Sequence, residues 1–398
     1  MPYPPRACPV CRSEEKTSLY RQQFAEVAGQ LQLDGYNVGL CGECGAAYAD
    51  DIPDQRWFDA YYQAVSKYTH DQSGGEEPEE DTRRFRDIAA HIAPYLPDPG
   101  SRIVDFGCAS AGLLRQLKDK GYPNVLGVDP SPASAEVARS RHGIRVVTTG
   151  LQEVTEEYGT FDLLIQVGVL EHIRDVDTAL LAIKQALRPG ALTYVEVPDV
   201  TGFADCYSAP FQQFSVEHIN FFSRSSLIRL MGRMGFEPVE VLRGARAHSA
   251  DAQMPIVYGM FRVGASLGGG RYERDAETEP ALRRYIKQSS EAEAGVGNVI
   301  DGLVASQEPL LVWGVGTHTL HLMETTAFRR LNVLAFVDSN PSYQDRMLAG
   351  RHVITPSQVA QYPQRILISS QVFQSEIDDQ IRNRLRLPND TIFLYPTA

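Results

Sequence analysis

The stretch from residue 103 to residue 112 reads IVDFGCASAG, and it decides the fold of this 398-residue chain. An apolar run that passes through an acidic residue and turns at Gly107 is typical of a buried strand followed by a ligand-binding loop, because glycine lets the backbone approach a ligand closely. The next predicted strand, residues 125–129, ends at Asp129. A carboxylate there can accept hydrogen bonds from both hydroxyls of a ribose. The sequence therefore predicts a site for a nucleotide-like ligand.

Strands and helices alternate around this motif. The hydrophobic pattern predicts helices at residues 85–92, 113–120, 134–141 and 177–187, and strands at residues 102–106, 125–129, 145–148, 161–167 and 191–197. Strands separated by helices imply a parallel sheet with right-handed crossovers, and hence a doubly wound α/β domain. Ligands bind such sheets beyond the carboxyl ends of the strands. Dinucleotide-dependent enzymes share this arrangement, so the pattern alone leaves the cofactor open.

Four cysteines form two pairs near the start of the chain, Cys8 with Cys11 and Cys41 with Cys44. Two residues between the cysteines of a pair let both thiolates face one ion, and two such turns complete a tetrahedral site. In a reducing compartment this pattern favours a metal over a disulfide. Four thiolates leave no open coordination position. We therefore expect a structural zinc ion that anchors a small lobe, with redox or catalytic metal chemistry as the alternative.

Aromatic residues gather between Trp57 and Tyr68, where the pattern predicts a short helix. This helix either packs the cysteine lobe onto the following domain or forms a lid that brings a tyrosine to the cofactor. Tyr68 is the better lid candidate. Residues 71–81 are acidic and rich in glycine, which is typical of a surface linker.

The composition and net charge of the chain argue against several classes of function. The net charge of −12 argues against binding a nucleic-acid backbone, since that requires a basic surface. No apolar run is long enough to cross a bilayer, and residues 1–6 carry no signal-peptide core. We therefore expect a cytoplasmic protein, monomeric or homodimeric, without a nucleic-acid or membrane partner.

The last part of the chain repeats the strand–turn–helix pattern. Residues 310–319 read LLVWGVGTHT, and further strands are predicted at residues 333–337 and 366–369. A helix-rich stretch at residues 280–304 precedes them. A second glycine turn could hold a nucleotide or diphosphate through Gly314, Gly316 and the amides near Thr317. The alternative is a scaffold that forms one wall of the active site or an oligomer contact.

Two further stretches identify the central domain more closely. Residues 161–173, FDLLIQVGVLEHI, and residues 186–192, ALRPGAL, together with the loop after Asp105, resemble the class I S-adenosylmethionine-dependent methyltransferases, rather than the dehydrogenases. In this loop Ala109 and Ala111 stand where the family has glycines. The resemblance implies that residues 150–152 flank the adenine and that Gln166 lines the methionine side. The full set of implied cofactor contacts, with the lid residue, is Asp105, Gly107, Ala109, Asp129, Gly150, Leu151, Gln152, Gln166 and Tyr68.

The order of the three parts resembles the deoxysugar C-methyltransferases, which act on nucleotide-linked ketosugars. The resemblance implies a zinc lobe with an aromatic lid at residues 1–70, a Rossmann-like methyltransferase core at residues 80–263 and a C-terminal Rossmann-like α/β domain at residues 280–398. In that family a base removes the proton beside a sugar ketone, and the enolate attacks the methyl group. Glu217 and His218 match the family's acid–base pair, and His172 matches its fourth-strand histidine.

Two positions depart from that family, because Ser215 replaces a tyrosine and Gly168 replaces an asparagine. We therefore expect an S-adenosylmethionine-dependent methyltransferase with a small-molecule acceptor, such as a nucleotide-linked sugar or a natural-product intermediate. The alternatives are an O- or N-methyltransferase for a non-sugar metabolite and a cofactor-binding scaffold without turnover.

Overall fold

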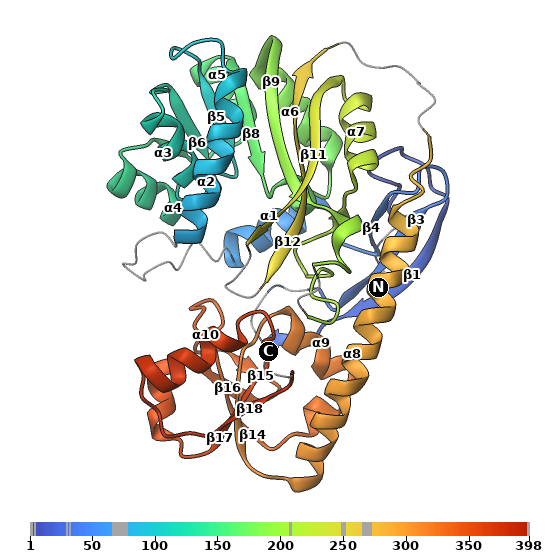
Figure 1. Cartoon of the computed structure of the whole chain (residues 1–398), viewed down its shortest axis with the longest axis vertical. Coiled ribbons are helices and arrows are strands. Elements are labelled where there is room, and N and C mark those ends of the chain that lie inside the picture. Colours follow the sequence, from blue (N-terminus) through green and yellow to red (C-terminus); the bar gives the residue numbers. More distant parts are fainter. Residues whose placement is uncertain are drawn as a thin grey trace.

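The fold was analysed in a computed structural model, which describes residues 3, 5–28, 31, 33–65, 79–206, 209–247, 252–264 and 273–395. Three sheets organise these residues. Figure 1 shows the central α/β part at the top and the C-terminal part at the bottom, with the N-terminal strands and the long helix α8 (Thr278–Ser306) along one side of the molecule. The predicted combination of two α/β parts and an N-terminal cysteine lobe is confirmed.

The central sheet has seven strands in the order β11-β12-β9-β8-β5-β6-β7. Strands β5 to β9 run parallel, whereas β12 is antiparallel to both of its neighbours. The strands are β5 (Ile103–Phe106), β6 (Val125–Val128), β7 (Val146–Val147), β8 (Phe161–Val167), β9 (Leu187–Pro198), β11 (Phe236–Ala247) and β12 (Gln253–Val263). The predicted alternation of strands and helices in this part is therefore confirmed.

Helices cover both faces of the central sheet. One hydrophobic core contains residues of α2 (Glu79–Ile92) and α3 (Gly112–Asp119) packed on strands β5, β8 and β9. The core on the other face contains residues of α5 (Leu151–Tyr158), α6 (Val176–Ala186) and α7 (Arg224–Arg233). The short helix α4 (Pro132–Val137) follows β6. Burial on both faces explains why the central strands are nearly continuous apolar runs.

The N-terminal lobe is a four-stranded sheet in the order β1-β3-β4-β10. Strands β1 (Lys16–Gln23), β3 (Gly35–Cys41) and β4 (Ala47–Asp50) come from the lobe, whereas β10 (Asn220–Phe221) comes from the central part of the chain. The predicted aromatic helix is α1 (Gln55–Val65), and Tyr68 lies outside the described residues. The lobe is therefore joined to the methyltransferase-like part by a shared sheet.

The C-terminal sheet has the order β18-β17-β13-β14-β16-β15-β2. Its parallel strands are β13 (Leu310–Trp313), β14 (Val333–Val337), β16 (Arg351–Ile354), β17 (Arg365–Ile368) and β18 (Thr391–Phe393). The antiparallel edge consists of β15 (Met347–Leu348) and β2 (Val27–Ala28), which belongs to the N-terminal lobe. Helices α9 (Thr317–Thr325) and α10 (Gln374–Asp379) follow β13 and β17.

One hydrophobic core joins the three parts. It contains Phe24 and Tyr36 of the lobe, Phe211 and Phe214 of the loop before β10, and Tyr285 of α8, together with residues of the C-terminal sheet. Tyr20 stacks on Phe211 with ring centroids 4.2 Å apart. The conformation of the loop before β10 therefore depends on packing against both the lobe and the C-terminal part. The domain boundaries at residues 70, 80, 263 and 280 stay predictions.

Gly45 is required by the way the lobe docks on the segment before α8. Its φ is +76°, and a Cβ at this position would lie 2.3 Å from the carbonyl oxygen of Asp275. We expect Gly45→Ala to lower the free energy of unfolding by about 2–4 kcal/mol, because left-handed strain and a backbone clash add. Gly295→Ala is the matched control, since a Cβ on that helical glycine meets nothing within 4 Å. Thermal unfolding of both variants tests this, and equal midpoints would contradict it.

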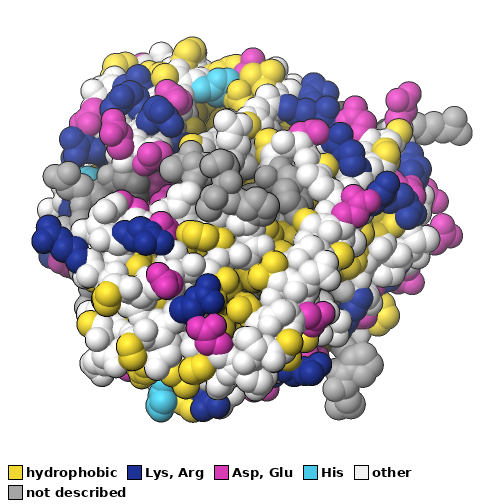
Figure 2. Space-filling model, turned by 60° about the horizontal axis from the view of Figure 1, so that its bottom comes forward, with side chains coloured by type: hydrophobic (Ala, Val, Ile, Leu, Met, Phe, Trp, Pro, Cys, Tyr) yellow, Lys and Arg dark blue, Asp and Glu magenta, His cyan; other side chains and the backbone are white. Residues whose placement is uncertain are grey.

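The surface mixes charges of both signs. Figure 2, which brings the C-terminal end of the molecule forward, shows Lys and Arg side chains interspersed with Asp and Glu side chains. The negative net charge is therefore not gathered into a single acidic field on this face. Among the described residues, none of the helices combines the length and the apolar character needed to cross a membrane.

Candidate active site

The loop after β5 has the backbone shape that its motif predicts. Gly107 has a φ of +78°, and Ala109 and Ala111 have φ values of +46° and +64°. These two alanines occupy left-handed conformations that glycine adopts without strain, which explains why glycine is the family's residue there. The amide of Gly107 donates to the carbonyl of Val128, 2.8 Å away, and so joins the loop to the end of β6.

Asp129 lies at the end of β6 and anchors this loop. Its Oδ2 accepts a hydrogen bond from the amide of Ala109, and its Oδ1 accepts one from the amide of Ser131, each 2.9 Å long. The carboxyl group is buried, and this desolvation raises its pKa. Each carboxylate oxygen can accept a second hydrogen bond. The arrangement therefore leaves capacity for a ribose beside the glycine loop.

The other predicted cofactor residues lie along the same edge of the sheet. Burial raises the pKa of Asp105 to about 7, with the Asp129 carboxylate as the next cause. Gly150 precedes the first turn of α5, where Leu151 is buried and Gln152 is exposed. Gln166 is fully buried and donates through Nε2 to the hydroxyl of Thr193, 3.0 Å away. Its side chain thus contacts β9, and cofactor contact at each of these residues stays a prediction.

The ribose assignment of Asp129 can be tested by substitution. We expect Asp129→Ala to weaken S-adenosylmethionine binding by about 1.5–3 kcal/mol, because hydrogen bonds to a charged acceptor are lost. Asp338→Ala is the matched control. Asp338 ends β14 and accepts from the amides of Val315 and Asn340, so its loss removes similar backbone contacts elsewhere. Calorimetric titration of both variants measures the effect, and equal affinities would show that Asp129 does not hold the cofactor.

A second group of polar side chains lies after β8. Nδ1 of His172 is 3.0 Å from the hydroxyl of Tyr62 and 3.0 Å from the carbonyl oxygen of Glu217. A carbonyl only accepts, so the contact with Glu217 is a hydrogen bond when the ring hydrogen of His172 is on Nδ1. The rings of His172 and His218 meet edge to face, with centroids 4.9 Å apart. The predicted pair of histidines is therefore brought together by the fold.

Glu171 completes this group, although sequence reasoning did not single it out. Its side chain is buried, with Oε1 3.9 Å from Nε2 of His172. Within the described part of the chain, Oε2 has no hydrogen-bond partner. Burial raises the pKa of this carboxyl group. The sequence feature that could have identified Glu171 is its position directly before His172, within an apolar stretch.

Two tyrosines of α1, which belongs to the N-terminal part, contact Glu217 and His172. The hydroxyl of Tyr61 donates to Oε1 of Glu217 over 3.4 Å, and that of Tyr62 contacts His172. Burial raises the pKa of both tyrosines well above the ordinary value. Helix α1 therefore places two tyrosines beside His172 and Glu217, and the contact of a lid tyrosine with the cofactor stays a prediction.

The loop that carries Glu217 and His218 is held from two sides. The lobe donates to its carbonyls, from Gln22 Nε2 to Phe214 over 2.9 Å and from Tyr36 Oη to Ser215 over 2.9 Å. Helix α8 accepts from its amides, because Phe211 donates to Ser289 Oγ over 3.2 Å and Gln213 donates to Tyr285 Oη over 3.0 Å. The Ser215 hydroxyl accepts from the amide of His218. Contacts from outside the central sheet thus order this loop.

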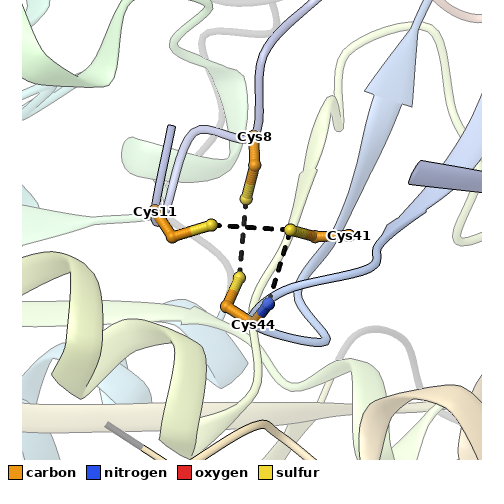
Figure 3. A group of neighbouring side chains, drawn as sticks. All are labelled: Cys8, Cys11, Cys41 and Cys44. Carbon is orange, nitrogen blue, oxygen red and sulfur yellow. Dashed lines mark hydrogen bonds between the residues drawn. The ribbon is translucent and has the colours of Figure 1, made fainter. Parts of the chain in front are cut away.

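The four predicted cysteine ligands converge on one point, with their sulfur atoms facing one another (Figure 3). The Sγ atoms of Cys8 and Cys44 are 3.6 Å apart, and those of Cys11 and Cys41 are 3.5 Å apart. Four sulfurs at a zinc–sulfur distance of 2.3 Å in a tetrahedron are about 3.8 Å apart. The cluster therefore fits a closed zinc site in the lobe.

Glu171, His172 and His218 also offer donor atoms that lie close enough to consider a metal ion. Two ligands with bonds of 2.1 Å in a tetrahedral site are about 3.4 Å apart. The separation of 3.9 Å between Glu171 and His172 exceeds this value. As arranged, the group is better suited to hydrogen bonding and proton transfer.

Comparison with known proteins identifies the central part. Residues 79–241 match the family model of a methyltransferase domain, and residues 306–393 match a model described as C2185-like, N-terminal. The chain is 24% identical to the C-methyltransferase NovU of Streptomyces niveus over 323 residues, which cover 75% of this chain and 72% of that protein.

Other relatives match a shorter part of the chain. The ubiquinone biosynthesis O-methyltransferase of Methylocella silvestris is 35% identical over 28% of this chain and 46% of its own length. The tRNA U34 carboxymethyltransferase of Cellvibrio japonicus is 26% identical over 38% of this chain and 50% of its own length. This chain thus spans about half the length of these two relatives.

Solved structures of methyltransferases also resemble part of the chain. The 1,6-didemethyltoxoflavin N1-methyltransferase of Burkholderia thailandensis, with S-adenosylhomocysteine bound, covers 56% of this chain at 19% identity and a TM-score of 0.41. That match covers 96% of the solved chain. Since the methyltransferase family model and the methyltransferase relatives match the doubly wound part described above, residues 79–241 form an S-adenosylmethionine-dependent methyltransferase domain.

Proposed function

We propose that this methyltransferase acts on a small-molecule acceptor, a nucleotide-linked sugar or a natural-product intermediate, and that Glu217 and His218 form its acid–base pair. The observation that carries the proposal is the convergence of His172, His218 and Tyr62 at the carboxyl end of β8, beside the predicted cofactor loop. The similarity to a C-methyltransferase over 75% of this chain supports the same conclusion.

S-adenosylmethionine, when bound, would supply a methyl group already activated by its sulfonium. What the protein must add is alignment and, for an acceptor that carries a proton, a base. His218 would take that proton from the acceptor carbon or hydroxyl through a ring nitrogen. With that proton held on His218, the acceptor would keep the electron pair that takes up the methyl group supplied by the cofactor. Glu217 would stabilise the charged imidazole, and His172 would orient the loop through the carbonyl of Glu217.

The C-terminal sheet supports a nucleotide on the acceptor. Asp338 holds the second glycine turn as Asp129 holds the first, with amide donors 2.7 Å and 2.8 Å away. At the same edge, Ser342 Oγ and Gln374 Oε1 are buried and have no hydrogen-bond partner among the described residues. Buried polar atoms are nearly always paired. A nucleoside diphosphate at this edge would provide partners for them.

We also propose that the four-cysteine cluster holds one structural Zn²⁺ ion. The closed set of thiols leaves no position for a substrate. The cysteine turns are docked on the core by Arg233 of α7, which donates to the carbonyls of Val10 and Pro9 at 2.8 Å and 2.9 Å. The ion would therefore stabilise the lobe and, through it, the loop before β10.

Mass spectrometry of candidate acceptors tests the proposed reaction. The enzyme and S-adenosylmethionine are incubated with nucleotide-linked ketosugars, the corresponding free sugars and hydroxylated natural-product intermediates. A gain of one methyl group on a nucleotide-linked sugar, together with solvent-deuterium exchange beside its ketone, is the expected result. Methylation of the free sugar at an equal rate would contradict the nucleotide requirement. Absence of methyl gain in all three acceptor groups would contradict the proposed acceptor class.

A binding experiment tests the nucleotide subsite separately. Thymidine diphosphate and S-adenosylmethionine are titrated into Asp129→Ala and Asp338→Ala. We expect Asp338→Ala to weaken only the diphosphate and Asp129→Ala to weaken only the sulfonium cofactor. Unchanged diphosphate affinity in Asp338→Ala would place the nucleotide elsewhere.

A further inference from the structure

Arg6 is a buried arginine of the N-terminal segment, two residues before the first cysteine of the cluster. Burial of a charged group is costly unless the group is paired, so its contacts are informative. The backbone of Arg6 is held on both sides. Its amide donates to Oδ1 of Asp50 over 2.7 Å, and its carbonyl accepts from Nζ of Lys16 over 3.0 Å. Asp50 and Lys16 also pair with each other over 2.7 Å. The guanidinium therefore starts from a fixed point of the lobe.

The guanidinium of Arg6 joins the two segments that carry the site histidines. Its Nη1 atom donates to the carbonyl of Ile219, 3.1 Å away, and its Nη2 atom donates to Oδ1 of Asn220, 2.7 Å away. These two residues directly follow His218. The Nη2 atom also donates to the carbonyl of Arg174, 2.9 Å away, in the turn that follows β8. A single side chain of the lobe thus contacts both segments.

Asn220 completes the bridge between these segments. Its side chain is buried, and its Nδ2 atom donates to the carbonyls of Leu170 and Ile173 over 2.7 Å and 2.8 Å, on either side of His172 in the sequence. The bond from Arg6 to Oδ1 fixes the orientation of this amide, because a carbonyl can accept only from its nitrogen side. Arg6 and Asn220 together therefore set the position of the His172 turn relative to β10.

The relative placement of the two histidine rings depends on this bridge. The rings of His172 and His218 meet with centroids 4.9 Å apart. The backbone beside them is joined as well, since the amide of Ile219 donates to the carbonyl of Glu171 over 2.9 Å. A displacement of about 1 Å near a reacting group can cost about 100-fold in rate. An arginine suits this task, because its planar fork reaches several acceptors at fixed angles, which the ammonium of a lysine cannot reproduce.

We propose that Arg6 is a positioning residue for methyl transfer, which holds His218 in place relative to His172. It acts through the carbonyl of Ile219 and the side chain of Asn220. The proposal rests on His218 as the base under the proposed function and adds the lobe residue that places this base. The N-terminal lobe thereby contributes to the chemical step as well as to the metal site.

A double-mutant cycle on the chemical step separates positioning from stability. Single-turnover rates with S-adenosylmethionine and a thymidine-diphosphate-linked ketosugar are measured for the parent, Arg6→Lys, His218→Ala and the double variant. Each rate is divided by the concentration of molecules that bind the cofactor. We expect Arg6→Lys to lower the parent rate about 10- to 100-fold. In the His218→Ala background it should lower the rate less than about 2-fold, because an absent base cannot be misplaced.

Two further variants complete this experiment. Arg12→Met is the matched control, since Arg12 of the same lobe donates to Asp177 of α6, and Asp177 keeps its pair with Arg233. Its rate should equal that of the parent. Asn220→Ala removes the bridge from its other end and should give the same losses as Arg6→Lys, so the test stands even if Arg6→Lys does not fold.

Nuclear magnetic resonance of the histidine rings gives a measurement that needs no acceptor. In Arg6→Lys the ring signals of His172 and His218 should shift, because their edge-to-face contact changes. The signal of His352, which is exposed on the C-terminal sheet, should stay in place. The signals are assigned from the single alanine variants of the three histidines.

Two outcomes would overturn the inference. Equal losses of rate from Arg6→Lys in the parent and in the His218→Ala background would show that Arg6 supports only the fold. Unchanged ring signals of both site histidines in Arg6→Lys would show that Arg6 does not place them. A parent-like rate of His218→Ala would instead contradict the base assignment of the proposed function, and the ring signals would still report on positioning.

Discussion

His218→Ala is expected to lower turnover about 100-fold or more, which is the usual contribution of a general base. The affinity for S-adenosylmethionine should change little, because His218 lies on the loop before β10 and is not one of the predicted cofactor contacts. His172→Ala should have a smaller effect on turnover. Its ring contacts the carbonyl of Glu217 and so orders the loop that carries the base. Single-turnover kinetics with a confirmed acceptor measure both effects on the chemical step.

His352→Ala is a suitable control, because His352 is exposed on the C-terminal sheet and far along the chain from the site. It should leave turnover unchanged. If His218→Ala retains the turnover of the parent under conditions in which chemistry limits the rate, the base lies elsewhere or the acceptor needs none. An amine that is already deprotonated is such an acceptor. Recovery of turnover by added imidazole would support the loss of a proton acceptor.

Removal of the zinc ion is expected to abolish most of the turnover while leaving cofactor binding nearly intact. Structural zinc contributes folding free energy directly, so the lobe should loosen without it. The lobe holds the loop before β10 through Gln22 and Tyr36, and a displacement of about 1 Å near a reacting group can cost about 100-fold in rate. The cofactor loop is anchored by Asp129 within the central sheet. We therefore expect turnover to fall about 100-fold, with S-adenosylmethionine affinity within about 2-fold.

Elemental analysis and a matched cysteine substitution test this prediction. The purified protein should contain about one zinc per chain. Cys44→Ser should lower the zinc content and the thermal midpoint, whereas Cys206→Ser, which lies outside the cluster, should do neither. A zinc-free protein that keeps both its thermal midpoint and its turnover would contradict the structural role of the ion.

The glycine loop and the acidic strand end of the predicted cofactor site could be predicted from the sequence, because the residues that form them are close together in the chain. Strand, glycine turn and acidic strand end all lie between residues 103 and 129, and the parallel sheet forces Asp129 to meet the loop at Ala109. The two cysteine pairs are similarly local, since each pair occupies one turn. In both cases the residue types and their spacing along the chain are enough to predict how the side chains are arranged at the site.

The acceptor side could be predicted only in part. His172 and His218 were identifiable from their motifs, but the contact between Tyr62 and His172 joins residues 110 positions apart. The position of Glu171 before His172 was visible in the sequence, but its burial, with no hydrogen-bond partner for Oε2 among the described residues, follows only from the fold.

The sequence by itself determined the doubly wound central domain, the C-terminal α/β domain and the glycine loop after β5, because hydrophobic periodicity and turn chemistry act over a few neighbouring residues. It also determined the four-cysteine cluster. Only the tertiary structure decided that the lobe gives β2 to the C-terminal sheet and receives β10 from the central part. These pairings, and the shared core around Phe211, are selected by packing between segments that are distant in the chain. The physical reason is that burial of apolar surface stabilises any two distant segments whose surfaces fit together. The local sequence pattern of one segment does not indicate which other segment it will pack against.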